Sequence, residues 1–171
     1  LLNHPEEYIR MWTVRFLGDA KLISKPMAER LYELAHIEAS PVVRCQLAAS
    51  AKRLSAEQGL PIVKAILDRD IDDNDERIPW MLWWAMESKS LTDRDLVLTT
   101  FSTPEAWNNG SYRGNLRRLM RRYAADGSAE GYDACVALWN TTPENQRESM
   151  VVALEQGLSE RSVGLVGVGQ G

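Results

Sequence analysis

The stretch from Ser40 to Leu54, SPVVRCQLAASAKRL, carries the signals from which the fold can be read. Ser40 is a typical helix N-cap residue, and the proline after it is tolerated because the first N–H groups of a helix have no intrahelical partner. Apolar side chains then recur at every third or fourth position, which is the spacing of one helix face. These residues are Val43, Leu47, Ala51 and Leu54. The stretch therefore predicts a helix over residues 41–56.

The Val43-Arg44 pair near the start of this helix marks a repeat. Arg10 and Arg44 are 34 positions apart, Ile78 follows Arg44 by 34, and the next marks follow at steps of 35 and 34. The pairs that mark the slot are Ile9-Arg10, Val43-Arg44, Arg77-Ile78, Tyr112-Arg113 and Gln146-Arg147. Such a step accommodates two helices of roughly ten to fifteen residues and two turns. The period therefore predicts an array of helical hairpins.

Turn residues separate the apolar stripes, and no segment alternates with a period of two for long enough to be a strand. Five prolines stand where a helix is expected to begin, which is where a missing N–H costs least. They are Pro26, Pro41, Pro61, Pro104 and Pro143. The predicted helices are 6–18, 26–38, 41–56, 60–69, 76–88, 92–102, 111–126, 129–140 and 143–158, with a short turn at 104–108. The fold class is therefore all-α.

The repeats are expected to fill residues 1–158, with the first repeat truncated, and the first helix to be the second helix of a broken pair. Residues 159–171 show no helical pattern and are interpreted as a Gly-rich tail or a linker to a following domain. Both ends are interpreted as cuts in a longer polypeptide. No apolar run approaches the roughly 20 residues needed to span a bilayer.

Composition narrows the function only slightly. A net charge of −4 argues against a dedicated nucleic-acid binder. Cys45 and Cys135 lie far apart and outside any CxxC pair, so we interpret them as small buried apolar residues. A disulfide between them stays open at this stage, since it depends on the separation of their Cα atoms.

The hairpins, with a V-R pair at the start of each second helix, resemble HEAT-type repeats. The resemblance implies an α–α superhelix, a HEAT/armadillo-like solenoid of about five hairpins. Whole phrases are also similar to the helical-repeat region of large proteins of planctomycete-type bacteria, which are labelled membrane-bound dehydrogenase-like or haem-binding. The phrases are IRMWTVRFLGD (9–19), LAHIEASPVVRCQLAASAKRL (34–54) and LPIVKAILDRDIDDNDERIPWMLWWAMES (60–88).

In those proteins a β-propeller-like part precedes the helical region and a cytochrome c-like part follows it. The resemblance therefore implies an extracytoplasmic location, periplasmic or at the cell surface, within a larger exported redox-type protein. The chain contains no CxxCH, so no covalent haem is assigned to it. Our expectation for the chain itself is no catalytic residue, no cofactor and no metal site.

The acidic run that begins at Asp70 resembles a calcium loop only in part. Asp70, Asp72 and Asn74 occupy the first, third and fifth positions, but Asp75 replaces the required glycine and Met81 the required bidentate acid. An EF-hand is therefore rejected. We interpret the run as a turn whose carboxylates cap the following helix. A loose cation site or a partner contact, with Asp72 and Asp75 as candidate residues, is the alternative.

The helix after this run carries three tryptophans. Trp80 and Trp84 share one stripe with Glu87, while Trp83 lies partly to the side. The indoles either pack in the core between neighbouring repeats or form an aromatic patch on the inner face of the solenoid. The sequence leaves both interpretations open.

Arginines gather on the predicted helix 111–126. Arg113, Arg117 and Arg121 form one stripe, and Arg118 and Arg122 form another. They either make an anion-binding or nucleic-acid-facing surface, in which Arg117 and Arg121 are candidates, or pair with acids of adjacent repeats. The acids considered are Glu87, Asp93, Asp95, Glu144 and Glu148.

The arginines of the repeat slot itself are interpreted as a ladder. At Arg10, Arg44, Arg113 and Arg147, one guanidinium per hairpin is expected to bond carbonyls or acids in the turn of the next hairpin. This role is structural. It needs an acceptor at a fixed distance along the chain from each arginine.

Three functions are compatible with these features. The favoured one is a non-catalytic scaffold or protein-interaction module whose partners are the flanking domains of the same polypeptide or another protein. The second is a HEAT-like DNA glycosylase or nucleic-acid-binding module, with Trp80, Trp83, Trp84, Asp75, Arg117 and Arg121 on the concave face. The third is a module that binds a peptide or helix in a groove. His4 and His36 have no metal-ligand partner at suitable spacing.

Overall fold

The computed structural model describes residues 1–166, with side chains through residue 161. Over this range the chain is helical and contains no strand, which confirms the all-α class. The α-helices are α1 (Glu7–Asp19), α2 (Lys25–Ile37), α3 (Pro41–Ala51), α4 (Ala56–Leu67), α5 (Ile78–Ser90), α6 (Arg94–Phe101), α7 (Gly110–Asp126), α8 (Ala129–Thr141) and α9 (Arg147–Val166). Two 3₁₀ helices, η1 (Pro104–Asn108) and η2 (Glu144–Gln146), precede α7 and α9. The short turn predicted at 104–108 is η1.

Several helix starts follow the predicted capping chemistry. The Ser40 hydroxyl accepts from the N–H of Val43 at the start of α3, and Thr103 accepts from the N–H of Ala106 at the start of η1. Each cap satisfies one of the N–H groups that a helix leaves without an intrahelical partner.

The start of α4 differs from the prediction. Pro61 lies inside α4, which already begins at Ala56. The turn ahead of the proline is buried against the end of α3: a Cβ built on Gly59 would come within 3.2 Å of the carbonyl carbon of Ala51. Packing of this turn therefore offsets the one helix hydrogen bond that Pro61 cannot make.

The last helix also differs. α9 begins at Arg147, after η2, and continues to Val166. It therefore covers residues 159–166, which were predicted to be tail. The rest of the predicted tail, 167–171, lies outside the described residues.

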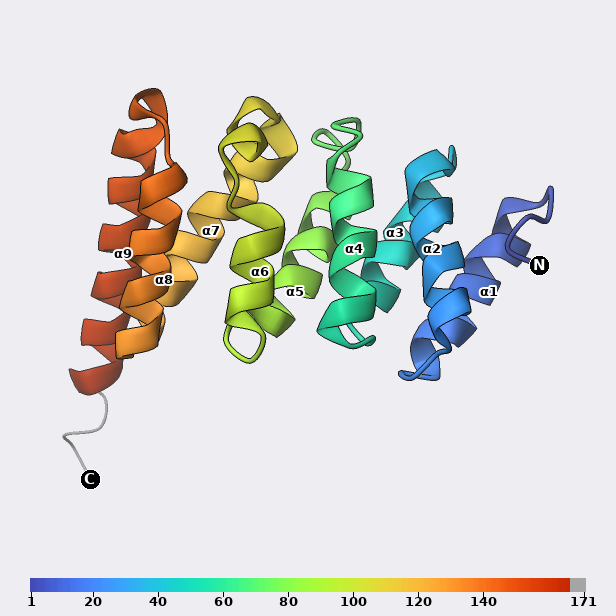
Figure 1. Ribbon diagram of the computed structural model, residues 1–171, viewed down its shortest axis with the longest axis horizontal. Helices are drawn as coiled ribbons and strands as arrows, with labels where there is room; N and C mark the ends of the chain where they lie inside the picture. Colours follow the sequence, from blue (N-terminus) through green and yellow to red (C-terminus); the bar gives the residue numbers. More distant parts are fainter. Residues whose placement is uncertain (167–171) are drawn as a thin grey trace. The chain divides into compact units, whose positions relative to one another are not determined.

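The chain forms two compact units, Leu1–Lys89 and Ser90–Gly171. In the first unit, α1 packs on α3, α2 packs on α4, and α3 packs on α4 (Figure 1). Side-chain hydrogen bonds join positions about one period apart: Arg69 donates to the carbonyl of Ala35, 34 positions away, and Gln58 to that of Ile23, 35 positions away. The period found in the sequence is thus the distance along the chain from one helix to the next but one, on which it packs.

The second unit repeats this alternation. There α6 packs on α8, α7 packs on α9, and α7 packs on α8. In both units, odd-numbered helices pack on odd-numbered ones and even-numbered on even-numbered ones. The core of each unit consists of the apolar faces between the two layers. Fully buried members include Leu31, Leu47, Leu54, Ile62 and Ile66 in the first unit and Phe101, Leu116, Leu119, Tyr123 and Leu138 in the second.

Close approach of odd-numbered helices depends on glycine. A Cβ on Gly157 of α9 would lie 2.7 Å from the Cβ of Ala124 on α7, and closer still to the carbonyl oxygen of Arg121. Gly18 of α1 meets α3 in the same way, with the Cα of Ser50 2.9 Å from a built Cβ. These contacts leave no room for a side chain unless the backbones separate.

Replacing Gly157 by alanine is therefore expected to destabilise the protein by about 1–3 kcal/mol, the usual cost of overpacking. This loss outweighs the roughly 1 kcal/mol that alanine contributes through helix propensity. Urea unfolding followed by circular dichroism measures the net change in the free energy of unfolding. The matched control is Gly114→Ala in α7, where nothing lies within 4 Å of a built Cβ. That variant should gain stability, and a gain of equal size at Gly157 would contradict the close packing of α7 on α9.

Candidate functional site

Arg44 anchors the turn between α4 and α5. Its Nε and Nη2 atoms donate to the carboxylate of Asp72, with Nε–Oδ2 2.9 Å and Nη2–Oδ1 2.6 Å. Its Nη1 donates to the carbonyl oxygens of Glu38 and Ala39. Both charged side chains are only 7% exposed. The guanidinium thus joins the turn before α3 to the turn before α5 through a fork that lysine cannot reproduce.

Arg10 makes the same set of bonds one repeat earlier. Its Nε and Nη2 donate to Glu38 at 2.8 and 2.7 Å, and its Nη1 donates to the carbonyls of His4 and Pro5. In both cases the acid follows the arginine by 28 positions, and the carbonyls precede it by five and six. Burial by itself would raise the pKa of Glu38, but the bonds from Arg10 and from the N–H of Ser40 outweigh it, and the pKa is lowered. The ladder is confirmed at these two positions for the acids, which lie in the turn of the next hairpin, whereas the carbonyls belong to the turn that precedes each arginine.

The ladder weakens toward the end of the chain. Arg113 keeps a carbonyl bond, from Nη1 to Trp107, but the residue 28 positions later is Thr141, which has no carboxylate. Arg147 instead places its guanidinium 5.5 Å from the centre of the Trp139 ring. The structure thus shows both the acid bond and the carbonyl bonds at Arg10 and Arg44, and a carbonyl bond at Arg113.

The two candidate aspartates have structural partners. Asp72 is 6% exposed and is held by Arg44. The Oδ1 atom of Asp75 accepts from the N–H groups of Arg77 and Ile78, each at 2.8 Å, and these two bonds lower its pKa. The predicted capping of α5 by the acidic run is therefore confirmed at Asp75. Asp72 lies inside the protein rather than on an interaction surface.

The three tryptophans of α5 divide between two environments. Trp83 is 8% exposed and belongs to the core, whereas Trp80 is 48% and Trp84 42% exposed. The rings of Trp80 and Trp84 are neighbours, with centroids 6.4 Å apart and an interplanar angle of 38°. The aromatic-patch hypothesis therefore retains these two side chains and loses the third.

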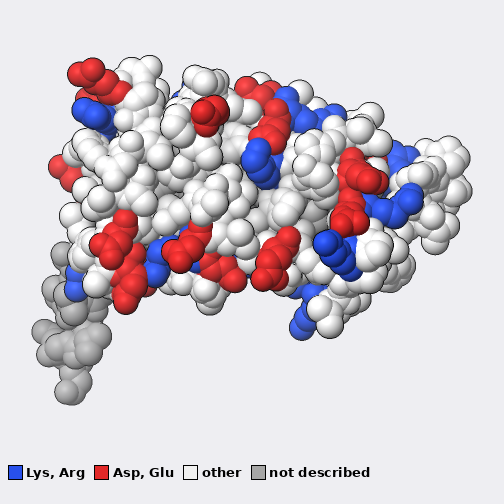
Figure 2. All heavy atoms as spheres, in the orientation of Figure 1, with Lys and Arg blue, Asp and Glu red and all other residues white. Residues whose placement is uncertain are grey.

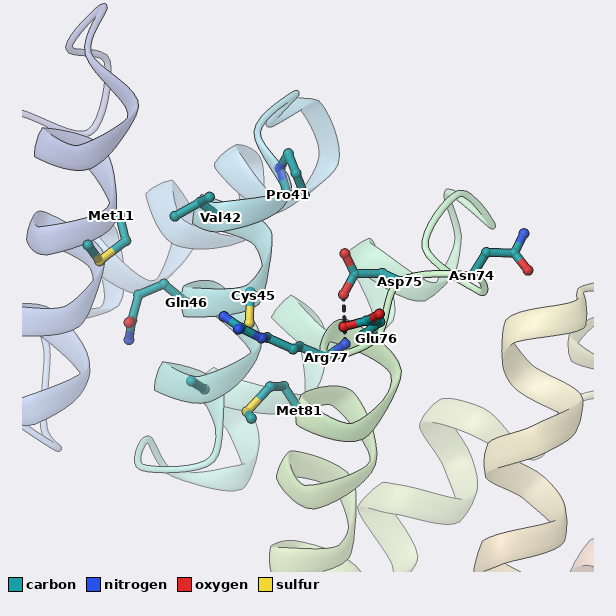
Figure 3. Close-up of a pocket in the computed structure, with 11 residues that line it drawn as sticks. Met11, Pro41, Val42, Cys45, Gln46, Asn74, Asp75, Glu76, Arg77 and Met81 are labelled. Carbon is teal, nitrogen blue, oxygen red and sulfur yellow. Dashed lines mark hydrogen bonds between the residues drawn. The ribbon is translucent and has the colours of Figure 1, made fainter.

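A groove of about 700 Å³ lies over α3 in the first unit (Figure 3). Its lining comes from α1, α3, α5 and the turn before α5, and we call it the α3 groove. The lining residues are Met11, Pro41, Val42, Cys45, Gln46, Ala49, Asn74, Asp75, Glu76, Arg77 and Met81. Figure 3 shows Met11 and Gln46 on one side, Met81 on the other, and the Arg77 side chain reaching from the start of α5 toward Cys45.

Two small residues of α3 form part of the groove lining. Cys45 and Ala49 are one helical turn apart and line it from α3. By the 34-residue period, Trp12 of α1 and Trp80 of α5 hold positions equivalent to Gln46 of α3, which lines the groove. Trp12 is 46% exposed. Trp12 and Trp80 do not line the groove, but each is next to a lining residue in the sequence, Trp12 to Met11 and Trp80 to Met81.

Cys45 is a free thiol within this groove, and Cys135 is a free thiol buried beside α7. Burial, followed by the negative charge of Asp75, raises the pKa of Cys45. Burial raises the pKa of Cys135 to about 11. Both thiols are therefore protonated at neutral pH. The predicted burial is confirmed for Cys135, whereas Cys45 is partly exposed.

Sequence reasoning missed the α3 groove and the exposed aromatic pair of α1. Trp12 and Phe16 of α1 have ring centroids 5.7 Å apart, and the Arg15 guanidinium lies 5.2 Å from the Trp12 ring. The available signal was a repeat slot that holds tryptophan in the two neighbouring repeats and glutamine in α3. Trp12, Gln46 and Trp80 are separated by 34 positions each.

The arginine cluster lies in the second unit and lines a different pocket. Arg117 and Arg121 are exposed and Arg118 is half-buried on α7. The ion pair that the structure shows is between Arg121 and Glu160 of α9, with an Nε–Oε1 distance of 2.8 Å, and Nη1 of Arg118 donates to Oδ1 of Asn115. The partner of Arg121 is therefore an acid outside the set considered from the sequence.

Charges of both signs share the surface. Figure 2 shows one face of the molecule, on which Lys and Arg atoms are interspersed with Asp and Glu atoms among the described residues. Exposed pairs such as Lys64 with Asp68 contribute to this mixture. On this face the described residues mix both charges, unlike the continuous basic stripe that is typical of nucleic-acid binders.

Comparison with protein-family models, curated proteins and solved structures gives no match to the chain. Within residues 1–166, none of the helices combines the length and the apolar character that crossing a membrane requires. The described part of the chain also lacks a group of three His, Cys, Asp or Glu side chains placed to hold a metal ion.

Proposed function

We propose that the chain is a non-catalytic protein-interaction module of the HEAT-type α-solenoid class, and that it binds an apolar helical segment of a partner in the α3 groove. The observation that carries the proposal is the groove itself, a mainly apolar surface, and the exposed indoles of Trp12 and Trp80 adjoin its lining residues Met11 and Met81 in the sequence. Exposed apolar grooves and tryptophans are typical of interaction sites. The partner is a flanking domain of the same polypeptide or another protein.

The solenoid class is supported by the repeated local architecture. Odd- and even-numbered helices form two layers in each unit, and Arg10 and Arg44 make the same bonds 34 positions apart. Repeat proteins use such surfaces as extended binding faces. The proposal is an inference from fold and surface chemistry, since fold alone does not fix function.

The two ends of the groove differ in charge, which would orient a bound partner. The carboxylates of Asp75 and Glu76 stand at the end where α5 begins, and the Arg77 side chain reaches from there toward Cys45 (Figure 3). Apolar contacts with Met11, Val42 and Met81 would supply most of the affinity. We expect the bound helix to place apolar residues at every third or fourth position over the groove and polar residues at this end.

Selection of short peptides against the protein tests the proposal, with Ala49→Arg as the decisive variant. A large cation at Ala49 fills the groove and removes its apolar character, so the selected peptides should lose binding at least about tenfold, equivalent to 1.4 kcal/mol. The readout is affinity by fluorescence anisotropy, after circular dichroism has shown that the variant is folded.

Val136→Arg is the matched control, because Val136 is an exposed aliphatic residue on α8, in the other unit. This control should leave affinity within about twofold. The proposal fails if the selected peptides bind Ala49→Arg as tightly as the unchanged protein.

The alternative function is a DNA glycosylase or nucleic-acid-binding module, and the arginine cluster of α7 is the observation in its favour. A glycosylase needs a free acid near the flipped base, and Asp75 was the candidate. Its Oδ1 already accepts two backbone N–H groups at the start of α5, and its exposure is intermediate. This engagement disfavours a catalytic role for Asp75. Retention on heparin at low salt, lost as salt rises, would support the nucleic-acid alternative.

The proposal also retains the wider setting expected from the sequence, a larger exported redox-type protein. This wider setting rests on the similarity of segments 9–19, 34–54 and 60–88 to the helical region of such proteins. The full reading frame tests it directly. A signal peptide upstream and a CxxCH motif downstream are expected, and a frame that has neither would remove the extracytoplasmic assignment.

A further inference from the structure

A pocket of about 600 Å³ lies between α7 and the segment formed by η2 and α9. We call it the arginine pocket, and it belongs wholly to the second unit. The residues that line it are Gly114, Arg117, Arg118, Arg121, Asn145, Gln146, Glu148, Ser149, Val152, Ala153 and Gln156. Gly114 borders open space in this pocket, since nothing lies within 4 Å of a Cβ built on it.

The α7 wall of the pocket carries three guanidinium groups within two helical turns. Arg121 is paired with Glu160, and Arg118 donates to Asn115. Arg117 is exposed and makes no hydrogen bond or ion pair with any described residue. Burial, followed by the positive charge of Arg117, lowers the pKa of Arg118. An anion placed at Arg117 would relieve this repulsion between like charges.

The opposite wall is built from neutral polar groups. The side-chain amides of Asn145, Gln146 and Gln156 have both donors and acceptors and bond no described residue. The Ser149 hydroxyl already donates to the carbonyl of Gln146, so its oxygen is left to accept. Such amides can pair with the N–H and C=O groups of a peptide backbone, while guanidinium groups on the facing wall bind carboxylates bidentately.

We propose that the arginine pocket binds an acidic peptide segment, with Arg117 as the main carboxylate-binding residue and the amides of α9 and η2 holding the peptide backbone. Two acids favour a peptide over a nucleic acid. Glu148 lines the pocket and Glu160 holds Arg121, so only a modest positive excess remains for a ligand. A nucleic-acid backbone carries a charge at every step and would meet repulsion there. The proposal does not depend on the α3 groove.

The test uses a fluorescein-labelled twelve-residue peptide of alternating glutamate and glycine, and a second peptide with glutamine at each glutamate. The acidic peptide is expected to bind and the neutral one to bind at least about tenfold more weakly, because charge-assisted hydrogen bonds are lost. Arg117→Gln should weaken binding of the acidic peptide about tenfold. Arg161→Gln, the same charge change at an exposed position outside the pocket, should leave it within about twofold.

Each remaining outcome overturns the proposal. Absence of binding by the acidic peptide removes the site. Equal weakening by Arg117→Gln and Arg161→Gln would show unspecific attraction to net charge. Displacement of the peptide by millimolar inorganic phosphate would indicate a small-anion site, and tighter binding of a single-stranded oligonucleotide, sensitive to Arg117→Gln, would indicate a nucleic-acid site. Thermal unfolding of each variant checks that the loss does not arise from unfolding.

Discussion

Replacing Arg44 by alanine is expected to lower the free energy of unfolding by about 3–5 kcal/mol, the cost of leaving one partner of a buried ion pair alone. The carboxylate of Asp72 would keep its burial and lose a bidentate partner, and the carbonyls of Glu38 and Ala39 would each lose a hydrogen bond. Urea unfolding monitored by circular dichroism measures the loss. The expected loss is large because the substitution disconnects two inter-helix turns at once.

Two further variants separate charge from packing. Arg44→Lys keeps the charge but cannot reach Asp72 and two carbonyls together, so it should lose an intermediate amount. The double variant Arg44→Met with Asp72→Leu removes both charges and should recover a large part of the stability lost in Arg44→Ala. A loss below about 1 kcal/mol for Arg44→Ala would be the size of an exposed ion pair and would contradict the ladder as a structural element.

Replacing Trp83 by alanine is expected to cost about 3–5 kcal/mol, the usual range for deleting a large buried aromatic side chain. Trp83 is 8% exposed and belongs to the buried apolar core. Denaturant unfolding measures the effect, and the change in midpoint should come without a change in slope.

The neighbouring tryptophans provide the matched controls. Trp80→Ala and Trp84→Ala remove side chains that are nearly half exposed, so each should change the free energy of unfolding by about 1 kcal/mol or less. Equal losses at Trp80, Trp83 and Trp84 would show that all three indoles are core residues. The exposed aromatic surface beside the α3 groove would then be lost as a binding candidate.

The repeat architecture followed from spacing alone. The step of 34 or 35 positions between marks such as Arg10, Arg44 and Ile78 predicted the alternation of helices, because each hairpin needs a fixed length of chain. The same spacing predicted the ladder, which the structure shows in full at Arg10 and Arg44. A local pattern is sufficient for such features, since each partner lies a constant number of residues away.

Helix boundaries depended on packing that no local pattern reports. Pro61 looked like a helix start, yet α4 begins at Ala56 because the preceding turn is buried against α3. Likewise α9 passes through Gly157, a poor helix former, because this glycine lets α9 approach α7. In both cases contacts with a neighbouring helix outweigh the residue's own preference.

The sequence by itself determined the helical class, the step between neighbouring helices, and the angular relation that puts Trp80 and Trp84 on one stripe and Trp83 to its side. It could not determine which side is covered. Only the tertiary structure decided that Trp83 is buried, that Asp72 is enclosed by Arg44, and that Cys45 and Ala49 line a groove. The physical reason is that helix periodicity fixes directions around one axis, whereas burial depends on which neighbouring helices pack against each direction.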